Sequence, residues 1–226
     1  MSVARIYAIA LNTYREAVRD RVLFGVLALA AGVLALTLAL GELSLDQQMR
    51  VVTDLGLASI SMFSVVIAIF LGSSLLYKEI ERKTLYVILP KPIARFEFLL
   101  GKYFGIVATC AVFIAIMGAL QLLVTAIQAG APTGLVIAVP VVLLAALGVG
   151  FLFASDRTLV VPIWSLVALA ATAWLASTVD VELFRLLASL VLNLGEVLIL
   201  TAVALLFSSF STPFLTGAFT FGVWLV

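Results

Sequence analysis

Histidine is absent from this 226-residue chain, and cysteine occurs only once, at Cys110. The lack of histidine excludes histidine-ligated zinc or haem and a histidine general base. One cysteine cannot form a disulfide within the chain, and its apolar neighbours predict a small buried side chain. Charged residues make up 11% of the sequence and the net charge is +1. The chain therefore has no overall basic field for binding nucleic acid.

The sequence is rich in apolar residues. They make up 65% of the chain, whereas a soluble domain is about 45–50% apolar and about 25% charged. A soluble core of this size cannot hide the excess, because a small domain keeps much of its surface in water. The composition argues against a soluble enzyme and predicts that a lipid bilayer surrounds most of the chain.

Six apolar runs are long enough to cross a membrane, because about 20 helical residues at 1.5 Å each span the ~30 Å hydrocarbon core. They predict an all-α fold, a polytopic transmembrane helical bundle with spans at 22–40, 56–77, 103–127, 134–154, 158–179 and 186–207. A seventh apolar segment, 214–226, is too short to cross as a straight helix. Either the chain is truncated within this partial span or its end is re-entrant, and we favour truncation. Residues 1–21 place apolar side chains at helical spacing and charges largely elsewhere, which predicts an amphipathic helix in the membrane interface.

The lysines and arginines predict how the bundle is oriented. Of the 13 basic residues, 11 lie before the first span, between the second and third, or between the fourth and fifth, and these places share one side. Only Arg50 and Arg185 fall on the other side. Because cytoplasmic loops carry an excess of lysine and arginine, the N-terminus and segment 78–102 are predicted to be cytoplasmic.

The sequence carries no motif typical of catalysis. The phosphate-binding pattern G-x-x-x-x-G-K-[ST], the zinc pattern H-E-x-x-H and the nucleophile pattern G-x-S-x-G are all missing. Glu196 is the only acid clearly inside a span, so no pair of carboxylates lies at matching membrane depth. We therefore expect neither catalytic residues nor a metal site in this chain.

Residues 78–102 form the only long charged segment, with six basic and three acidic residues. Leu85 and Ile88 follow helical spacing, and Pro92 ends that helix because the residue before a proline avoids the α region. The next helix begins around Arg95 and leads into the third span. A short amphipathic helix between two spans fits a docking surface for a partner. It equally fits a solvated loop whose charges only set topology, and the residues alone leave both interpretations open.

The same segment carries a family resemblance. Tyr77 to Lys102, YKEIERKTLYVILPKPIARFEFLLGK, is similar to the cytoplasmic coupling segment of ABC-2-type transporter permeases, in particular the branch associated with multi-copper enzyme and nitrous-oxide reductase maturation. ALLFSSFSTPFL, at 204–215, resembles the serine-rich turn that this family has after a late span. ALNTYREAVRDR, at 10–21, resembles its opening interfacial helix. The three matches occur in the order that the family has.

The chain also departs from the family pattern. The family usually has six spans with the serine-rich turn after the fourth, whereas here the turn follows the sixth. We interpret residues 131–189 as an inserted two-span hairpin, which keeps the serine-rich turn on the cytoplasmic side. The expected organisation is an interfacial helix over 1–21 and one transmembrane permease domain over 22–226.

The resemblance implies a permease subunit of an ATP-driven exporter, a multi-pass protein of the cell (cytoplasmic) membrane with a cytoplasmic N-terminus. The implied partners are a cytoplasmic ABC ATPase, which holds the ATP and Mg, and a second permease copy in a homodimer or heterodimer. This chain itself is expected to bind no cofactor and no nucleic acid. The residues that the resemblance assigns to ATPase coupling are Glu79, Glu81, Arg82, Lys83, Thr84, Leu85, Ile88, Lys91, Pro92, Arg95 and Glu97.

Glu196 is the other candidate functional residue. It lies 12 residues before Ser208, about 18 Å of helix from the predicted cytoplasmic turn and hence near mid-bilayer. Asn193 shares its face at i, i+3. An acid inside the membrane costs roughly 2.5–3.5 kcal/mol, so it normally faces protein or water. Asn193 and Glu196 line the translocation path or the dimer seam in one interpretation, and Glu196 is a hydrogen-bonded structural residue in the other.

Other polar and small residues inside the spans predict helix packing. Gln121 and Thr125 are expected to form hydrogen bonds between helices. Gly101 and Gly105, four residues apart, permit two helices to approach closely.

Two further functions stay open. A membrane scaffold or assembly factor without transport would use a docking segment equally well. An intramembrane lipid-processing enzyme would need acids, arginine or histidine clustered on one face, and the sequence offers almost none.

Overall fold

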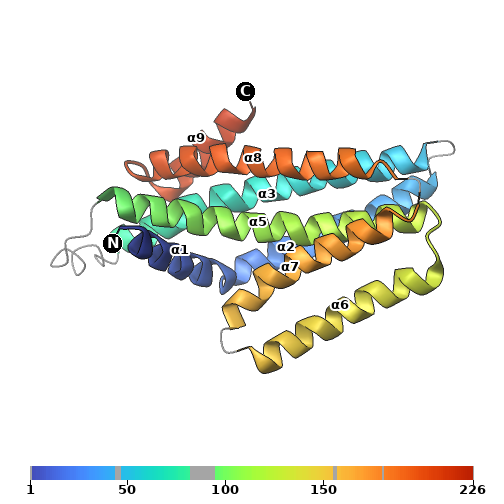
Figure 1. The fold of residues 1–226 in the computed structure, drawn as a ribbon. Coiled ribbons are helices and arrows are strands. Elements are labelled where there is room, and N and C mark those ends of the chain that lie inside the picture. Colours follow the sequence, from blue (N-terminus) through green and yellow to red (C-terminus); the bar gives the residue numbers. More distant parts are fainter. Residues whose placement is uncertain (1, 44–46, 82–94, 155–156, 180, 226) are drawn as a thin grey trace. The chain divides into compact units, whose positions relative to one another are not determined.

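The computed structural model describes residues 2–43, 47–81, 95–154, 157–179 and 181–225. Within these ranges the chain is helical and has no strand, which confirms the predicted all-α fold (Figure 1). The helices in chain order are α1 Ser2–Val18, α2 Arg21–Leu43, α3 Gln48–Glu81, α5 Arg95–Gln128, α6 Thr133–Phe153, α7 Arg157–Ala176, α8 Leu183–Ser208 and α9 Pro213–Leu225.

In the described part of the chain, six helices are long and apolar enough to cross a membrane. They cover 21–43, 48–74, 96–128, 133–153, 158–176 and 183–208, and each overlaps one of the six predicted spans. The bounds differ most for the second helix, which begins at 48 rather than at the predicted 56. A helix suits the bilayer because it satisfies its backbone N–H and C=O groups internally. The chain is therefore a multi-pass helical membrane protein. Helix α9, with 13 residues, is shorter than a straight crossing requires.

Several helix boundaries follow from local sequence. The Asp20 carboxylate accepts a hydrogen bond of 3.0 Å from the backbone N–H of Val22, which caps the first turn of α2. Gly130 follows α5 at φ +78°, a left-handed conformation that favours glycine. Pro132 directly precedes α6, and Pro213 is the first residue of α9, where a missing N–H costs nothing.

The described chain divides into two compact units. The first contains 1–24, 64–111 and 194–226, and the second contains 25–63 and 112–193. Helices α2, α3, α5 and α8 contribute residues to both units. Each unit has its own packing.

In the first unit, α1 packs on the start of α5 through two glycines. A Cβ on Gly101 would lie 2.6 Å from the Cβ of Ile9, and a Cβ on Gly105 would lie 2.6 Å from the Cβ of Thr13. The predicted close approach at these glycines is thus confirmed, and its partner is α1. We call this contact between α1 and α5 the glycine seam.

The end of α8 packs on both α3 and α5 in the same unit. Gly72 of α3 faces Ala204 of α8, where an added Cβ would lie 2.6 Å from the alanine methyl. The Tyr103 hydroxyl of α5 donates to the backbone oxygen of Leu198 over 3.2 Å. Small residues and backbone acceptors thus hold these helices together, as expected where lipid supplies no hydrophobic driving force.

In the second unit, α6 and α7 form a packed pair, at the place of the predicted two-span hairpin. The indole N–H of Trp164 in α7 donates to the backbone oxygen of Leu143 in α6 over 2.7 Å. Helix α6 is continuous through Pro140, and the indole gives the Leu143 oxygen a partner from the neighbouring helix. Val160 of α7 fits against Gly150 of α6. A separate apolar cluster joins α5, α7 and α8 through Leu122, Ala176 and Leu186.

Gln121 and Thr125, one turn apart on α5, have different partners. The Gln121 amide donates to the backbone oxygen of Val52 in α3 over 3.2 Å, so its predicted bond between helices is confirmed. The Thr125 hydroxyl instead bonds within α5, to the backbone oxygens of Gln121 and Leu122 at 3.1 and 3.0 Å. The prediction for Thr125 is wrong, because a helical threonine readily reaches its own carbonyls one turn back.

Candidate functional site

The predicted coupling segment is described only at its two ends. Helix α3 continues to Glu81 and α5 begins at Arg95, so the backbones of Glu79, Glu81 and Arg95 are helical. Their side chains lie outside the described residues, as do those of the whole stretch 75–95. The predictions for Arg82, Lys83, Thr84, Leu85, Ile88, Lys91 and Pro92 likewise fall outside the described residues.

Glu97 is the one predicted coupling residue whose side chain is described. It lies in the first turn of α5, one turn before Gly101, and its side chain is 8% exposed. A guanidinium nitrogen of Arg5 in α1 lies 3.8 Å from its carboxylate. This ion pair therefore joins the same two helices as the glycine seam.

Lys102 is a second charged residue beside the seam. Its side chain is buried, and its ammonium nitrogen lies 5.6 Å from the centre of the Phe98 ring. That distance is within the range of a cation–π contact. The start of α5 thus buries one acid and one base.

Glu196, the predicted intramembrane acid, contacts α9. The indole N–H of Trp224 donates to its carboxylate over 2.6 Å, and Glu196 is half-buried. This bond agrees with the structural interpretation of Glu196. Asn193 lies one turn earlier on α8, and its buried amide nitrogen has no hydrogen-bond partner within the described ranges. A role for this pair in a path or a dimer seam stays a prediction.

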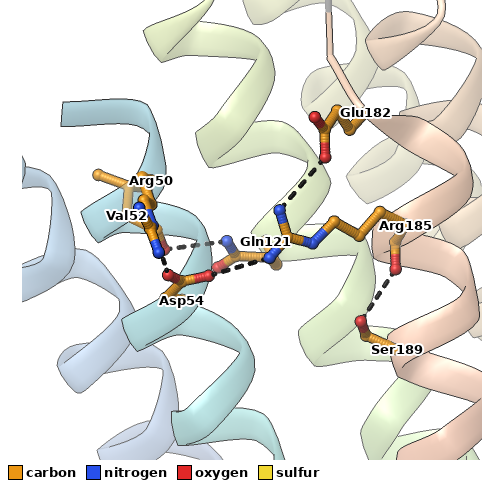
Figure 2. Close-up of polar contacts among 7 residues, drawn as sticks. All are labelled: Arg50, Val52, Asp54, Gln121, Glu182, Arg185 and Ser189. Atoms are coloured by element: carbon orange, nitrogen blue, oxygen red, sulfur yellow. Dashed lines mark hydrogen bonds and ion pairs between the residues drawn. The ribbon is translucent and has the colours of Figure 1, made fainter. Parts of the chain in front are cut away.

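A group of charges that the sequence did not single out gathers in the second unit (Figure 2). Asp54 of α3 lies 3.6 Å from Arg50, one turn earlier, and 3.9 Å from Arg185 of α8. Arg185 also donates to Glu182 over 3.3 Å. We call Arg50, Asp54, Glu182 and Arg185 the charged cluster. One carboxylate is thus shared between two guanidinium groups from different helices.

The charged cluster surrounds a cleft of about 370 Å³. Its polar lining consists of the cluster and Thr53, and its apolar lining consists of Met49, Val181 and Leu186. The four charged side chains are at least half exposed, so water reaches them. The cleft therefore offers donors, acceptors and an apolar wall to a small ligand.

The helices behind the cluster are held by neutral contacts. Gln121 bonds to the backbone oxygen of Val52, which lies between Arg50 and Asp54 on α3 (Figure 2). Gly56 leaves the room that the Gln121 amide occupies. On α8, the Ser189 hydroxyl donates to the backbone oxygen of Arg185 over 2.9 Å. The bond of Ser189 lies within α8, and α8 packs on α5 and α7 through Leu186. The cluster is thus presented from two helices that both pack on α5.

One sequence signal pointed toward this cluster. Arg50 and Arg185 are the two basic residues that the loop-charge count places apart from the other 11. Their pairing with one aspartate was not visible, because 135 positions separate them along the chain. Within the described ranges, no group of three histidine, cysteine or acidic side chains is arranged to hold a metal ion.

The fold and these contacts define a multi-pass helical membrane protein that is consistent with a permease or a scaffold. Comparison of the chain with family models, with curated proteins and with solved structures found no match.

Proposed function

We propose that this chain is the membrane-spanning permease subunit of an ATP-driven ABC-2-type exporter. In this proposal, a separate cytoplasmic ATPase docks on residues 78–102. Glu79, Glu81, Arg82 and Lys83 supply charged contacts, and Leu85 and Ile88 supply the apolar anchors. Closure of two ATPase subunits then moves the spans of two facing permeases.

The length of α3 and α5 is the observation that carries the proposal. Each has 34 residues, about 51 Å at 1.5 Å per residue, whereas the hydrocarbon core is about 30 Å thick. Helices α6 and α7, with 21 and 20 residues, are close to the crossing length. The extra length of α3 and α5 leads directly to the two ends of the charged segment. A force on that segment would therefore act on helices that are continuous with two spans.

The contact between α1 and α5 supports the same proposal. A helix that transmits force needs support near the point where the force is applied. The glycine seam and the Arg5–Glu97 ion pair supply this support at the first turns of α5. Glu97 then holds α5 in place, and the residues before it contact the ATPase.

An ABC ATPase gene beside the gene for this chain would favour transport, and its absence would favour a scaffold. Where such an ATPase is encoded, its co-purification with this chain tests the proposal. We expect the double variant Glu81→Ala/Arg82→Ala to lose most of the bound ATPase and the stimulation of ATP hydrolysis, because two charged contacts disappear. Glu16→Ala/Arg19→Ala is the matched control, since it removes one exposed acid and one exposed base outside residues 78–102. ATPase retained by the first variant at wild-type yield would refute the docking site. Binding with no change in hydrolysis, for the wild-type chain, would favour the scaffold function instead.

A further inference from the structure

The charged cluster lies where two helices of the second unit begin (Figure 2). Arg50 is the third residue of α3, and Arg185 is the third residue of α8. The N-terminus of a helix carries partial positive charge and free backbone N–H groups, which favour an anion. Two helix starts and two guanidinium groups thus give this cleft donors for an anionic group.

The ion pairs of the cluster contribute little to stability. Their distances are 3.3 to 3.9 Å, and the Arg50 and Glu182 side chains are 71% and 77% exposed. Water and salt screen exposed pairs of this kind, so that breaking them costs little. A guanidinium group has five N–H donors, more than these contacts use. The cluster can therefore exchange its internal pairs for a ligand at small cost.

The position of the cleft indicates the kind of molecule that reaches it. It lies within the first two turns of α3 and α8, both long enough to cross the membrane, so it is at the depth of lipid headgroups. Its wall of Met49, Val181 and Leu186 is apolar. A ligand with a charged head and an apolar body matches both parts of this lining.

The charges of the lining select among headgroups. Two guanidinium groups match a phosphate, and two carboxylates match an ammonium group, so a zwitterion satisfies all four. A primary ammonium donates hydrogen bonds to carboxylates, whereas a quaternary ammonium cannot and is typically held by aromatic rings. Among the described residues that line the cleft, none is aromatic. The lining thus favours ethanolamine over choline.

We propose that the cleft binds the phosphoethanolamine headgroup of a membrane phospholipid. The phosphate accepts hydrogen bonds from Arg50 and Arg185, and the ammonium donates to Asp54 and Glu182. This inference goes beyond the proposed function and does not depend on ATPase coupling, because it uses residues of the second unit alone.

Native mass spectrometry of the full chain tests this site. The delipidated protein is mixed with equal amounts of phosphatidylethanolamine and phosphatidylcholine that have identical acyl chains. We expect the wild type to retain phosphatidylethanolamine about tenfold better, and Arg185→Gln and Asp54→Asn to lose that preference. Arg185→Lys keeps the charge but not the planar fork, so an intermediate preference is expected. Glu42→Gln is the control, since Glu42 is exposed at the end of α2 and does not line the cleft.

Three results would overturn the proposal. The first is equal retention of the two lipids by the wild type, or an unchanged preference in Arg185→Gln. The second is better retention of phosphatidylglycerol, which would indicate an anionic lipid. The third comes from thermal unfolding: soluble glycerophosphoethanolamine raises the melting temperature of the wild type as much as phosphatidylethanolamine does, which would indicate a water-soluble ligand. If Arg185→Gln does not give a monodisperse protein, Arg50→Gln replaces it, because the Arg50 side chain is 71% exposed and its loss disturbs the fold least.

Discussion

Arginine pairs with a carboxylate in both units, in opposite surroundings. In the first unit, Arg5 faces Glu97, whose side chain is 8% exposed and lies beside the glycine seam. In the second unit, Arg50 and Arg185 face Asp54, whose side chain is 50% exposed. A buried carboxylate that loses its partner cannot regain water, whereas an exposed one can. The same pair is therefore structural in the first unit and exchangeable in the second.

The glycine seam gives the largest expected effect. Gly105→Val adds a Cβ 2.6 Å from the Thr13 Cβ and 2.7 Å from the backbone oxygen of Ala10, so α1 must move away from α5. We expect the free energy of unfolding to fall by about 3 kcal/mol, measured as thermal unfolding in detergent. Gly32→Ala is the control, because a Cβ there meets nothing within 4 Å. Equal melting temperatures for the two variants would show that the seam is not tightly packed.

The two ion pairs can then be compared directly. Arg5→Gln leaves the Glu97 carboxylate buried without its cation, and we expect a loss of about 1–2 kcal/mol, reduced from the fully buried case because Arg5 is 43% exposed. Arg50→Gln, the matched change in the second unit, is expected to cost less than about 0.5 kcal/mol. Thermal unfolding of both variants at low and high salt checks the contrast. Equal losses would mean that burial does not separate the two pairs.

The α6–α7 pair of the second unit combines apolar packing with a polar contact between the two helices. Trp164→Phe removes the indole donor to Leu143 and leaves the apolar packing largely in place. We expect a loss of about 1 kcal/mol, typical of one hydrogen bond. Trp174→Phe on the same helix is the control, because Trp174 is 59% exposed. Thermal unfolding of both variants in detergent, with a lower melting temperature for Trp164→Phe than for the control, checks this contact.

Tyr14 of α1 gives the smallest effect, and only at high pH. Its side chain is 4% exposed, its hydroxyl has no hydrogen-bond partner among the described residues, and burial raises the pKa of Tyr14 from 10.0 to about 12. The phenol thus ionises more readily in the unfolded chain, and stability is lost as pH rises from about 10 through about 12. Tyr14→Phe should match the wild type at pH 7 and lose less stability between pH 10 and 12. Parallel losses for both proteins over that window would contradict the burial of this hydroxyl.

The sequence predicted the spans well because membrane crossing depends on composition over a window of about 20 residues. It also found Gln121, since an amide in a span needs a partner. The identity of each partner was not predictable. Val52 lies 69 positions from Gln121, and α1 rather than another span fills the groove at Gly101 and Gly105. Such pairings depend on how the helices are arranged, which composition does not specify.

The charged cluster, too, could not be predicted from composition, because it depends on which helices pack together. Asp54, Glu182 and their arginines are each unremarkable in polar connections, where charge normally sets topology. Only the approach of α3 to α8 brings them around one cleft. For Glu196, the cost of an acid in the membrane predicted that it needs a partner, but Trp224 of the short helix α9 was not foreseen.

The close contact of α1 with α5 also limits how this protein can diverge. In a saturation library selected for correct insertion, codons 101 and 105 should return glycine almost exclusively, because every other side chain begins with the Cβ that these sites exclude. Codons 25 and 32, where a Cβ meets open space, should accept many residues. Tolerance at individual glycine codons would thus mark where helices meet most closely, the contact of α1 with α5 included, without any structure determination.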